Sequence, residues 1–489
     1  MKKIKNILVL ILVTSICFTS CDDYLDVNDS IDNPNLSELN PNQLIVGAQS
    51  RSAETYTNRV NRIGNWMGVA WSGNYLAFND AYGPESRYQF STTFYNDVWD
   101  NLYRFTSNFA TIENYEDGRN WNNQKAAAKI LKTFYFQYIV DLYGDAPYTE
   151  AFQGSDFLFP TYDDAQDIYI DLINTLDEAI ALINSGTDLE PFGSSDITFN
   201  GDMDKWLAFA NTVKLRLLVR LILKAETDSE LLTFVNSKFT DLNTATFIDE
   251  DVVINPGYTN SDDRQNPFWE VYGANPVGVL TNQGRQTGPS LFAFNLLTNS
   301  NDERLNRIWK TNPDSGVFAG TPQNGNGNSA AIGDGILKGP DADLPIMLSS
   351  ESYFLQAEAI QRGYLNGNAQ SMFNMGIQSS YDFLGAGDAS SYISDNDTDI
   401  DLGFNGGNPL RAILTQKWIA LTSVSGAELW IEYNRTGYPS NLPLPENSTD
   451  TNIPLRLLYP ASEYSGNSNN VINQTRSDAF TSKIFWDVN

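Results

Sequence analysis

The chain lacks histidine altogether, and its only two cysteines, Cys17 and Cys21, lie close to its start. Without histidine there is no Ser-His-Asp or Cys-His catalytic site, no histidine general base and no H-E-x-x-H zinc site. A disulfide-stabilised core is excluded, because no cysteine follows residue 21. There is no G-x-x-x-x-G-K-[ST] phosphate loop and no strand-to-helix G-x-G-x-x-G unit. We therefore expect no cofactor and no activity that depends on these groups.

Basic residues are scarce as well: 31 lysines and arginines stand against 60 aspartates and glutamates, for a net charge of −29. Such a surface repels phosphate backbones, and the basic footprint that nucleic-acid binding needs is missing. The charge suits solubility outside the cell. A hydrophobic content of 41% with 12% aromatic residues is enough for a large core, so we expect a folded body.

Long hydrophobic runs are missing too. No segment comes near the roughly 18 to 20 consecutive apolar residues that a membrane-spanning helix needs. The start of the chain does have the order of a signal peptide: Lys2, Lys3 and Lys5, then a short apolar stretch, then small or polar residues before Cys21. We assign residues 1–20 to this signal peptide and expect no membrane span in the mature protein.

Cys21 is the predicted lipidation site. Ser20 before it resembles the bacterial lipobox, in which a small residue at the cleavage site leaves the modified cysteine as the new N-terminus. Several acyl chains would anchor the protein stably to a membrane. Ordinary secretion with an incidental cysteine is the alternative, and Phe18 at the usual aliphatic position departs from the lipobox. Residues 21–41 then form a lipidated N-terminus and tether, and residues 42–489 a single domain.

Helical patterns dominate that domain. In residues 124–143 apolar side chains recur at intervals of three and four before Gly144 and Pro147 end the run. Residues 163–183 predict a second amphipathic helix, which could pair antiparallel with the first. Further helices are expected over residues 206–223, 230–239, 350–362, 369–383, 411–421 and 427–433. The predicted fold is mostly α. The helix pairs suggest tetratricopeptide-like hairpins, and these are degenerate because no strict 34-residue repeat is visible.

Long irregular stretches separate the helices, at residues 60–100, 245–290, 311–348 and 436–476. Loops longer than about 15 residues in a compact domain usually carry function or disorder. The first two stretches are rich in aromatic residues, which argues against disorder. We therefore expect a loop-rich, irregular part that carries the ligand site.

Two of these stretches combine aromatic residues with hydrogen-bonding side chains, the mixture that binds neutral sugars. The predicted ligand-binding residues are Trp71, Asn74, Tyr75, Asp80, Tyr82, Arg264 and Trp269. Trp71, Tyr75, Tyr82 and Trp269 are the candidate stacking platforms, and Asn74, Asp80 and Arg264 the candidate polar contacts. The alternative for any one aromatic residue is a structural role, in which Trp66 continues a buried helix and Trp269 anchors its loop.

Carboxylates are the catalytic groups that the composition still allows, because glycoside hydrolysis needs only two acids at a set separation. Glu428 and Glu432, four residues apart on a predicted helix, share one face. A solvated helix surface is the interpretation that we favour for this pair. We predict a protein that is not an enzyme.

One acidic loop alternates as the ligands of a calcium loop might: Asp395, Asp397, Asp399 and Asp401. An EF-hand needs glycine at the sixth position and a bidentate glutamate at the twelfth, where this chain has Ile400 and Gly406. The loop is therefore not an EF-hand. A looser calcium loop and an ordinary acidic surface loop both remain open, and we predict no metal site.

Several strings of residues together resemble the SusD/RagB family of outer-membrane nutrient-binding lipoproteins, particularly its SusD-like branch. They are L-Y-G-D-A-P-Y (142–148), D-E-R-L (302–305), E-S-Y-F-L-Q-A-E-A (351–359), Q-K-W-I-A-L (416–421), E-L-W-I-E-Y-N-R-T-G-Y-P (428–439) and L-Y-P (458–460). They span nearly the whole mature chain in the order of the family. Asn434 and Leu455 depart from the arginines that the family often has. The strings indicate the fold rather than a binding site.

The resemblance implies a body of four degenerate tetratricopeptide-like hairpins that carries a less regular ligand-binding part. It implies a TonB-dependent (SusC-like) outer-membrane transporter as partner, over which the lipoprotein lies as a lid. Oligosaccharides, of the starch type or another, are the expected cargo, and oligopeptides are the alternative. Asp22 and Asp23 resemble the early acidic residues that accompany export to the cell surface, so we expect a lipid-anchored, surface-exposed protein of the outer membrane.

Overall fold

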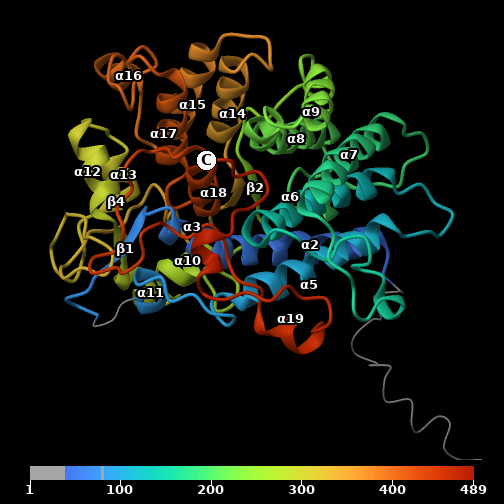
Figure 1. The fold of residues 1–489 in the computed structure, drawn as a ribbon, viewed down its shortest axis with the longest axis horizontal. Helices are drawn as coiled ribbons and strands as arrows, with labels where there is room; N and C mark the ends of the chain where they lie inside the picture. Colours follow the sequence, from blue (N-terminus) through green and yellow to red (C-terminus); the bar gives the residue numbers. More distant parts are fainter. Residues whose placement is uncertain (1–38, 79–81) are drawn as a thin grey trace, which may run out of the picture.

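Helices make up most of the protein, which a computed structural model describes over residues 39–78 and 82–489 (Figure 1). The longer helices are α2 (Pro41–Thr55), α5 (Asn96–Glu113), α6 (Asn122–Tyr143), α7 (Ala165–Asn184), α8 (Met203–Ala225), α9 (Ser229–Leu242), α14 (Ser349–Gln361), α15 (Ala369–Leu384), α17 (Pro409–Leu421) and α18 (Gly426–Thr436). All eight helices predicted from sequence patterns are present within a few residues of the expected bounds, so the mostly α fold class is confirmed.

The ends of α7 show how local sequence sets these helices. The Asp164 side chain accepts hydrogen bonds from the backbone N–H groups of Gln166 and Asp167, at 2.8 and 3.3 Å, and so satisfies two donors that the first turn leaves unpaired. The preceding helix α6 ends at Gly144, whose φ of +82° suits glycine.

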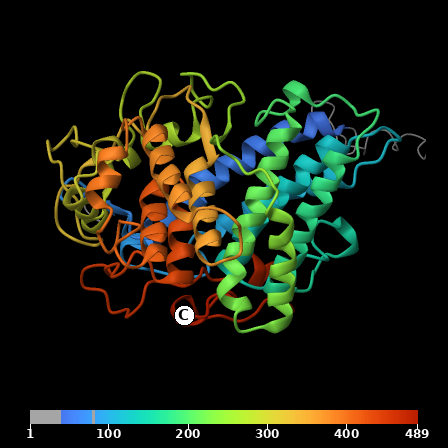
Figure 2. The same ribbon diagram turned by 90° about the horizontal axis from the view of Figure 1, so that it is seen from above.

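Neighbouring helices pack in pairs, as in tetratricopeptide repeats. Helix α5 packs on α6, α6 on α7, α8 on α9, α14 on α15, and α17 on α18. Figure 2 shows the orange helices of the C-terminal half on one side and the green and teal helices on the other, with the blue helix α2 running behind them. The predicted helix hairpins are therefore confirmed.

A continuous helical rod near the start of the described chain was not predicted. It consists of α2, a π-helical segment η2 (Tyr56–Val60) and α3 (Asn61–Met67). Asn40 caps it in a capping box with Gln43. The π segment has a wider turn than an α-helix, and such segments are frequent at functional sites.

The loop-rich part of the protein comprises residues 68–78, 82–95, 243–348 and 437–489. Its short helices are α4 (Gly83–Ser86), α10 (Pro267–Tyr272), α11 (Asn282–Gln286), α12 (Leu291–Asn299), α13 (Leu305–Ile308), α19 (Ala461–Gly466) and α20 (Asp478–Thr481). Among the described residues its strands form three antiparallel pairs: β1 (Trp71–Gly73) with β3 (Thr287–Pro289), β2 (Val252–Ile254) with β6 (Leu344–Met347), and β4 (Trp309–Lys310) with β5 (Ala331–Ile332). The first pair joins the two stretches of predicted ligand-binding residues.

A network of buried charges joins the helix pairs. Arg216 on α8 and Glu351 on α14 are both fully buried and make a bidentate pair at 2.8 and 2.9 Å. Arg220, one turn further along α8, contacts both Asp141 on α6 and Glu428 on α18. Charges in the interior are tolerated when each has partners, and this network ties four helices together.

The network continues along α18 to a second arginine. Arg435 makes a bidentate pair with Glu358 on α14, at 2.9 and 2.8 Å, and also binds Glu432. Lys417 on α17 donates to the same Glu432 at 3.0 Å. Burial alone would raise the pKa of Glu432, but Arg435, Lys417 and Arg220 together hold it well below its usual range.

No helix in the described part of the chain is both long enough and apolar enough to cross a membrane.

Candidate functional site

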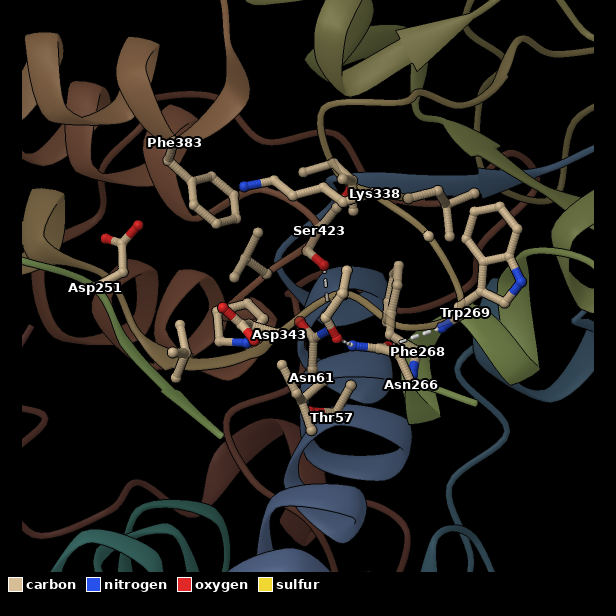
Figure 3. Close-up of a pocket in the computed structure, with 18 of the residues that line it drawn as sticks. Thr57, Asn61, Asp251, Asn266, Phe268, Trp269, Lys338, Asp343, Phe383 and Ser423 are labelled. Carbon is tan, nitrogen blue, oxygen red and sulfur yellow. Dashed lines mark hydrogen bonds between the residues drawn. The ribbon is translucent and has the colours of Figure 1, made fainter. Parts of the chain in front are cut away.

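A cavity of about 580 Å³ lies where the helical rod meets the loop-rich part. Its walls come from η2 and α3, from α10, from the segment that precedes β6, from the end of α15 and from the turn between α17 and α18. Figure 3 shows Trp269 and Phe383 at opposite sides of this cavity, with polar side chains between them. Its volume is within the range of small-molecule sites.

Asn266 holds two walls of the cavity together. Its side-chain oxygen accepts from the backbone N–H groups of Phe268 and Trp269, at 2.9 and 3.1 Å, and so caps α10. Its side-chain nitrogen donates to the carbonyl of Ala342 on the facing segment, at 2.9 Å. Pro267 at the first helical position is preorganised for the helix start. The cap therefore fixes where α10 presents its aromatic residues.

Trp269 is partly exposed at the rim of the cavity. Its indole N–H donates to the carbonyl of Ala274 at 2.9 Å, which fixes the orientation of the ring. A Cβ atom on Gly273 would lie 2.6 Å from that ring, so only glycine allows the indole to pack against the backbone here. The ring is anchored from one side and remains accessible from another.

Lys338 is the cation of the cavity lining. Its ammonium nitrogen lies 3.7 Å from the centre of the Phe383 ring. Figure 3 shows the lysine side chain extending to this ring. Within the described ranges it makes no ion pair. Burial lowers the pKa of Lys338 from its ordinary value, and the carboxylates of Asp251 and Asp343 partly oppose this effect. The ammonium group is therefore exposed, positioned against the Phe383 ring and available to a ligand.

Asp251, Asp341 and Asp343 line the same cavity, and two of these carboxylates are held by hydrogen bonds. Asp251 accepts from the backbone N–H and the hydroxyl of Ser349, both at 2.9 Å, and burial raises its pKa. Asp343 accepts from the side-chain amide of Asn255 at 2.8 Å. Each carboxylate has further lone pairs beyond these bonds. The cavity therefore offers hydrogen-bond acceptors as well as donors.

The floor of the cavity is a close crossing of α3 and α18. A Cβ atom on Gly64 would lie 2.1 Å from the backbone nitrogen of Ala427, so the two backbones touch. Asn61 accepts from the N–H of Gly426 at 2.7 Å and donates to the carbonyl of Ser423 at 3.2 Å. These bonds fix the turn that carries Ser423 into the cavity.

Trp71 lies behind the turn that carries Ser423, and its predicted role as a stacking platform is wrong. The side chain is fully buried, its N–H donates to the hydroxyl of Ser423 at 2.8 Å, and its ring lies edge-on to Tyr272. A ligand cannot stack on a ring that is enclosed by the core. Trp71 therefore supports Ser423 from behind.

Two more predicted contacts are corrected in the same way. Asn74 is fully buried, and its amide donates weakly to the carbonyl of Arg285 at 3.4 Å. Tyr82 is 7% exposed because Arg62 covers its ring and Trp66 packs at 5.0 Å, so it is not an open platform. Burial raises the pKa of Tyr82 to about 12.

The remaining predicted residues have different positions. Tyr75 is partly buried, and its hydroxyl accepts from the backbone N–H of Asn324 at 2.8 Å. Arg264 is exposed and does not line the cavity. Trp269 does line it. Asp80 and Cys21 lie outside the described residues.

Sequence reasoning missed most of the lining. Lys338 and Asp343 lie in the stretch 311–348, which was predicted only as a loop, and Asp251 and Phe383 lie at element ends. The one available signal was the length of that loop, because long loops in compact domains tend to be functional. Nothing in the local sequence indicates that Lys338 would meet Phe383.

The pair Glu428 and Glu432 is also corrected. Neither lies on a solvated helix surface: both are buried, at 0% and 7% exposure, and bind the arginines and the lysine of the charge network. Buried carboxylates that are held by cations have no access to a glycosidic bond. The carboxylates of Glu428 and Glu432 therefore have a structural role.

The acidic loop at residues 395–401 has ordinary bonding. Asp397 accepts from the Asn405 amide at 3.0 Å, Asp399 from two backbone N–H groups of its own turn, and Asp401 pairs with Arg411. Over the described parts of the chain, no three acidic side chains gather as metal ligands would. The looser calcium loop is therefore not supported.

A loop-framed cavity on a scaffold of helix hairpins defines a class of α-helical ligand-binding protein. The sequence model of one family, SusD-like, described as starch-binding and associating with the outer membrane, matches residues 33–460. The chain belongs to this SusD-like family, which confirms the resemblance of its sequence strings.

Solved structures of the same fold cover almost the whole chain. One is described as a chitin-binding protein, with 23% identity and a TM-score of 0.72 over 93% of this chain and 100% of that one. A chitin-binding SusD homolog from Flavobacterium johnsoniae has 21% identity and a TM-score of 0.74 over 91% and 99%. A SusD/RagB family protein from Bacteroides thetaiotaomicron has 20% identity and a TM-score of 0.72 over 92% and 99%. No curated protein matches the chain.

Proposed function

We propose that this protein is a non-catalytic, lipid-anchored glycan-binding protein of the outer membrane, and that a sugar occupies the cavity between Trp269 and Phe383. The observation that carries the proposal is the composition of the lining. Aromatic rings lie at two sides, and hydrogen-bond donors and acceptors lie between them.

A neutral sugar fits this lining chemically. Its apolar ring face stacks on the accessible part of Trp269. Its hydroxyl groups both donate and accept, so one ligand serves the carboxylate of Asp343 and the ammonium group of Lys338 at once. A strongly anionic ligand would instead meet three carboxylates here and the net charge of −29 of the whole chain. Neutral glycans are therefore the expected cargo.

The family and its solved members support a carbohydrate ligand. The family is described as starch-binding, and two structures of the same fold are described as chitin-binding. Starch-type and chitin-type oligosaccharides are accordingly the first ligands to test. Oligopeptides are the alternative cargo.

We also propose that acyl chains on Cys21 anchor the protein and that it delivers its cargo to a TonB-dependent transporter. The lipobox-like residues before Cys21 and the membership of an outer-membrane-associated family support this. Cys21→Ser should release the protein from the membrane fraction, and retention of that variant would contradict lipidation. Copurification with a large outer-membrane barrel in mild detergent is the expected result for the native protein.

Calorimetry of the purified protein against maltose-type, chitin-type and peptide panels tests the binding proposal. Trp269→Ala should weaken glycan binding several-fold or more, because stacking on one aromatic ring contributes on the order of 1 kcal/mol. Phe159→Ala is the matched control, since Phe159 is 63% exposed and lies outside the cavity.

Three results would contradict the proposal. Unchanged affinity in folded Trp269→Ala would remove this residue from the site. Binding of peptides but of no glycan would replace the cargo. Hydrolysis of a bound glycan would make the protein an enzyme.

A further inference from the structure

Three consecutive apolar side chains are exposed to solvent between α6 and α7. Phe157, Leu158 and Phe159 have exposed fractions of 40%, 70% and 63%, and they follow the 3-10 helix η3 (Gly154–Asp156). Single exposed apolar residues are ordinary on a protein surface, but an exposed run of three marks a contact surface. We call residues 157–159 the apolar loop.

Hydrogen bonds from a distant segment fix the backbone of the apolar loop. The carbonyl of Phe159 accepts from the side-chain amide of Asn470 at 2.9 Å. The carbonyl of Pro160 accepts from the side-chain amide of Asn467 at 2.8 Å. Both amides belong to the turn that follows α19. The three apolar side chains are therefore presented on a fixed backbone, which lowers the entropic cost of binding through them.

This part of the chain is strongly acidic. Residues 133–204 contain fifteen aspartates and glutamates and neither lysine nor arginine. Asp156 directly precedes the apolar loop and is exposed. Just after the loop, the backbone N–H of Thr161 donates to the carboxylate of Glu150 at 2.7 Å. Within the described ranges neither of these carboxylates makes an ion pair, so no salt bridge compensates the two charges.

A hollow of about 450 Å³ adjoins the apolar loop, between α5 and the segment that carries α19. Phe157 lines it, together with the carboxylates of Asp100, Glu150 and Glu463 and one cation, Arg104. Acids therefore outnumber cations around the apolar loop. The surface that complements it has basic side chains around an apolar recess, whereas an anionic lipid surface would be repelled.

We propose that the apolar loop docks into an apolar recess of a partner protein, with lysine or arginine side chains of that partner around the recess. The partner that we assign to this surface is the transporter of the proposed function, on which this assignment rests. None of the three loop residues lines the cavity between Trp269 and Phe383. Docking and glycan binding therefore use separate surfaces, and variants can separate them.

Photo-crosslinking in intact cells of the native host tests the docking surface. The full-length protein carries the photoreactive residue p-benzoylphenylalanine in place of Phe159, and irradiation should give an adduct with an outer-membrane barrel, identified by mass spectrometry. The same residue in place of Ile400, which is 56% exposed, is the matched control and should give little of that adduct. Figure 1 shows α16 (Ser390–Asn396), which precedes Ile400, and α19, beside the apolar loop, at opposite edges of the molecule.

A double substitution tests the apolar side chains directly. Leu158→Ser with Phe159→Ser should lower copurification of the barrel in mild detergent about tenfold or more, because two apolar contacts are lost. Both positions are exposed, so the free energy of unfolding and the glycan affinity should stay as in the unaltered protein. Met375→Ser with Ile400→Ser, at exposed apolar positions elsewhere, is the matched control and should leave copurification unchanged.

The acidic surroundings are tested by Asp156→Asn, which removes one exposed charge without shortening the side chain. Copurification should fall about threefold at low salt and less at high salt, because exposed charges are screened. Unchanged recovery at low salt would overturn the basic rim of the partner.

The remaining outcomes distinguish docking from glycan binding. An adduct with lipid, or no adduct at position 159, would overturn the docking surface, as would unchanged copurification of Leu158→Ser with Phe159→Ser. An adduct with a protein other than a barrel would overturn the transporter as partner, and with it the delivery step of the proposed function. Absence of glycan binding would contradict the proposed function but leave the adduct with the barrel unaffected.

Discussion

Charged side chains are paired in the buried network between the helix pairs, but the cation of the cavity beside the loop-rich part has no ion pair in the described part of the chain. In the network every charged side chain has an oppositely charged partner, such as Arg216 with Glu351. In the cavity Lys338 rests on the ring of Phe383 and makes no ion pair within the described ranges. The charged residues that pair with one another inside the helix pairs hold the scaffold together. A charged side chain without an ion pair, at the boundary with the loop-rich part, is available to a ligand.

Breaking the network should have the largest effect. Glu351→Ala leaves Arg216 buried without its carboxylate, and removing one partner of a buried pair costs about 3–5 kcal/mol. Denaturant unfolding should show this loss in the free energy of unfolding. The matched control is Asp334→Ala, which breaks the exposed pair with Lys310 and should cost about 1 kcal/mol or less. Equal losses in the two variants would contradict the distinction between the regions.

Acid should weaken the network in a defined direction. The pKa of Glu432 is held well below its usual range, so this carboxylate contributes stability above its unfolded value of about 4.5. That contribution is lost as the pH falls from about 4.5 through the lower folded-state pKa. Glu432→Gln cannot ionise at this position. Its free energy of unfolding should therefore lie furthest below that of the unaltered protein near neutral pH, and the difference should shrink below about pH 4.5.

Thermal or denaturant unfolding of both proteins between pH 3 and 7 measures this deficit. Glu303→Gln is a suitable control, because Glu303 lies outside the network and its substitution should give no comparable pH-dependent difference. A deficit in Glu432→Gln that stayed constant down to pH 3 would contradict the role of the neighbouring cations.

Removing the charge of Lys338 should have the smallest effect on stability. We expect it to weaken ligand binding instead. Lys338→Met keeps the length of the side chain and its contact with Phe383, so the protein should fold with nearly unchanged stability. Its glycan affinity should fall several-fold, because one hydrogen bond from a charged donor is lost. Calorimetry measures the change, and Lys310→Met outside the cavity is the control. An unaltered affinity in Lys338→Met would remove the lysine from the site.

The scaffold was predictable from the sequence because its signals are local and repeated. The apolar period of residues 124–143 and 163–183, the acidic cap at Asp164 and the stop at Gly144 each predict a helix without knowledge of the fold. The helix α2 was missed because its apolar residues are few and small ones interrupt them. Its burial comes from contacts with distant segments.

The site was less predictable because its residues meet only in three dimensions. Trp71 and Trp269 look alike in the sequence, as aromatic residues among glycine and asparagine, yet the first is enclosed by the core and the second stands at a rim. The prediction that Glu428 and Glu432 lie on a solvated helix surface was wrong for a related reason. Helix periodicity shows that two acids share a face but does not show that arginines from α8 cover it.

The crossing of α3 and α18 has a consequence for how fast a ligand exchanges. Gly64 brings the two backbones into contact, and Asn61 fixes the turn at Ser423 by hydrogen bonds. The floor of the cavity between Trp269 and Phe383 is therefore preformed in the absence of ligand. Binding to a preformed wall needs no slow rearrangement, so association should proceed near the ordinary encounter rate. Related glycans should then enter at similar rates and differ chiefly in how long each remains bound. Side chains at the rim can therefore set how long a glycan stays bound while the floor stays unchanged, which would suit the proposed delivery of cargo to a transporter.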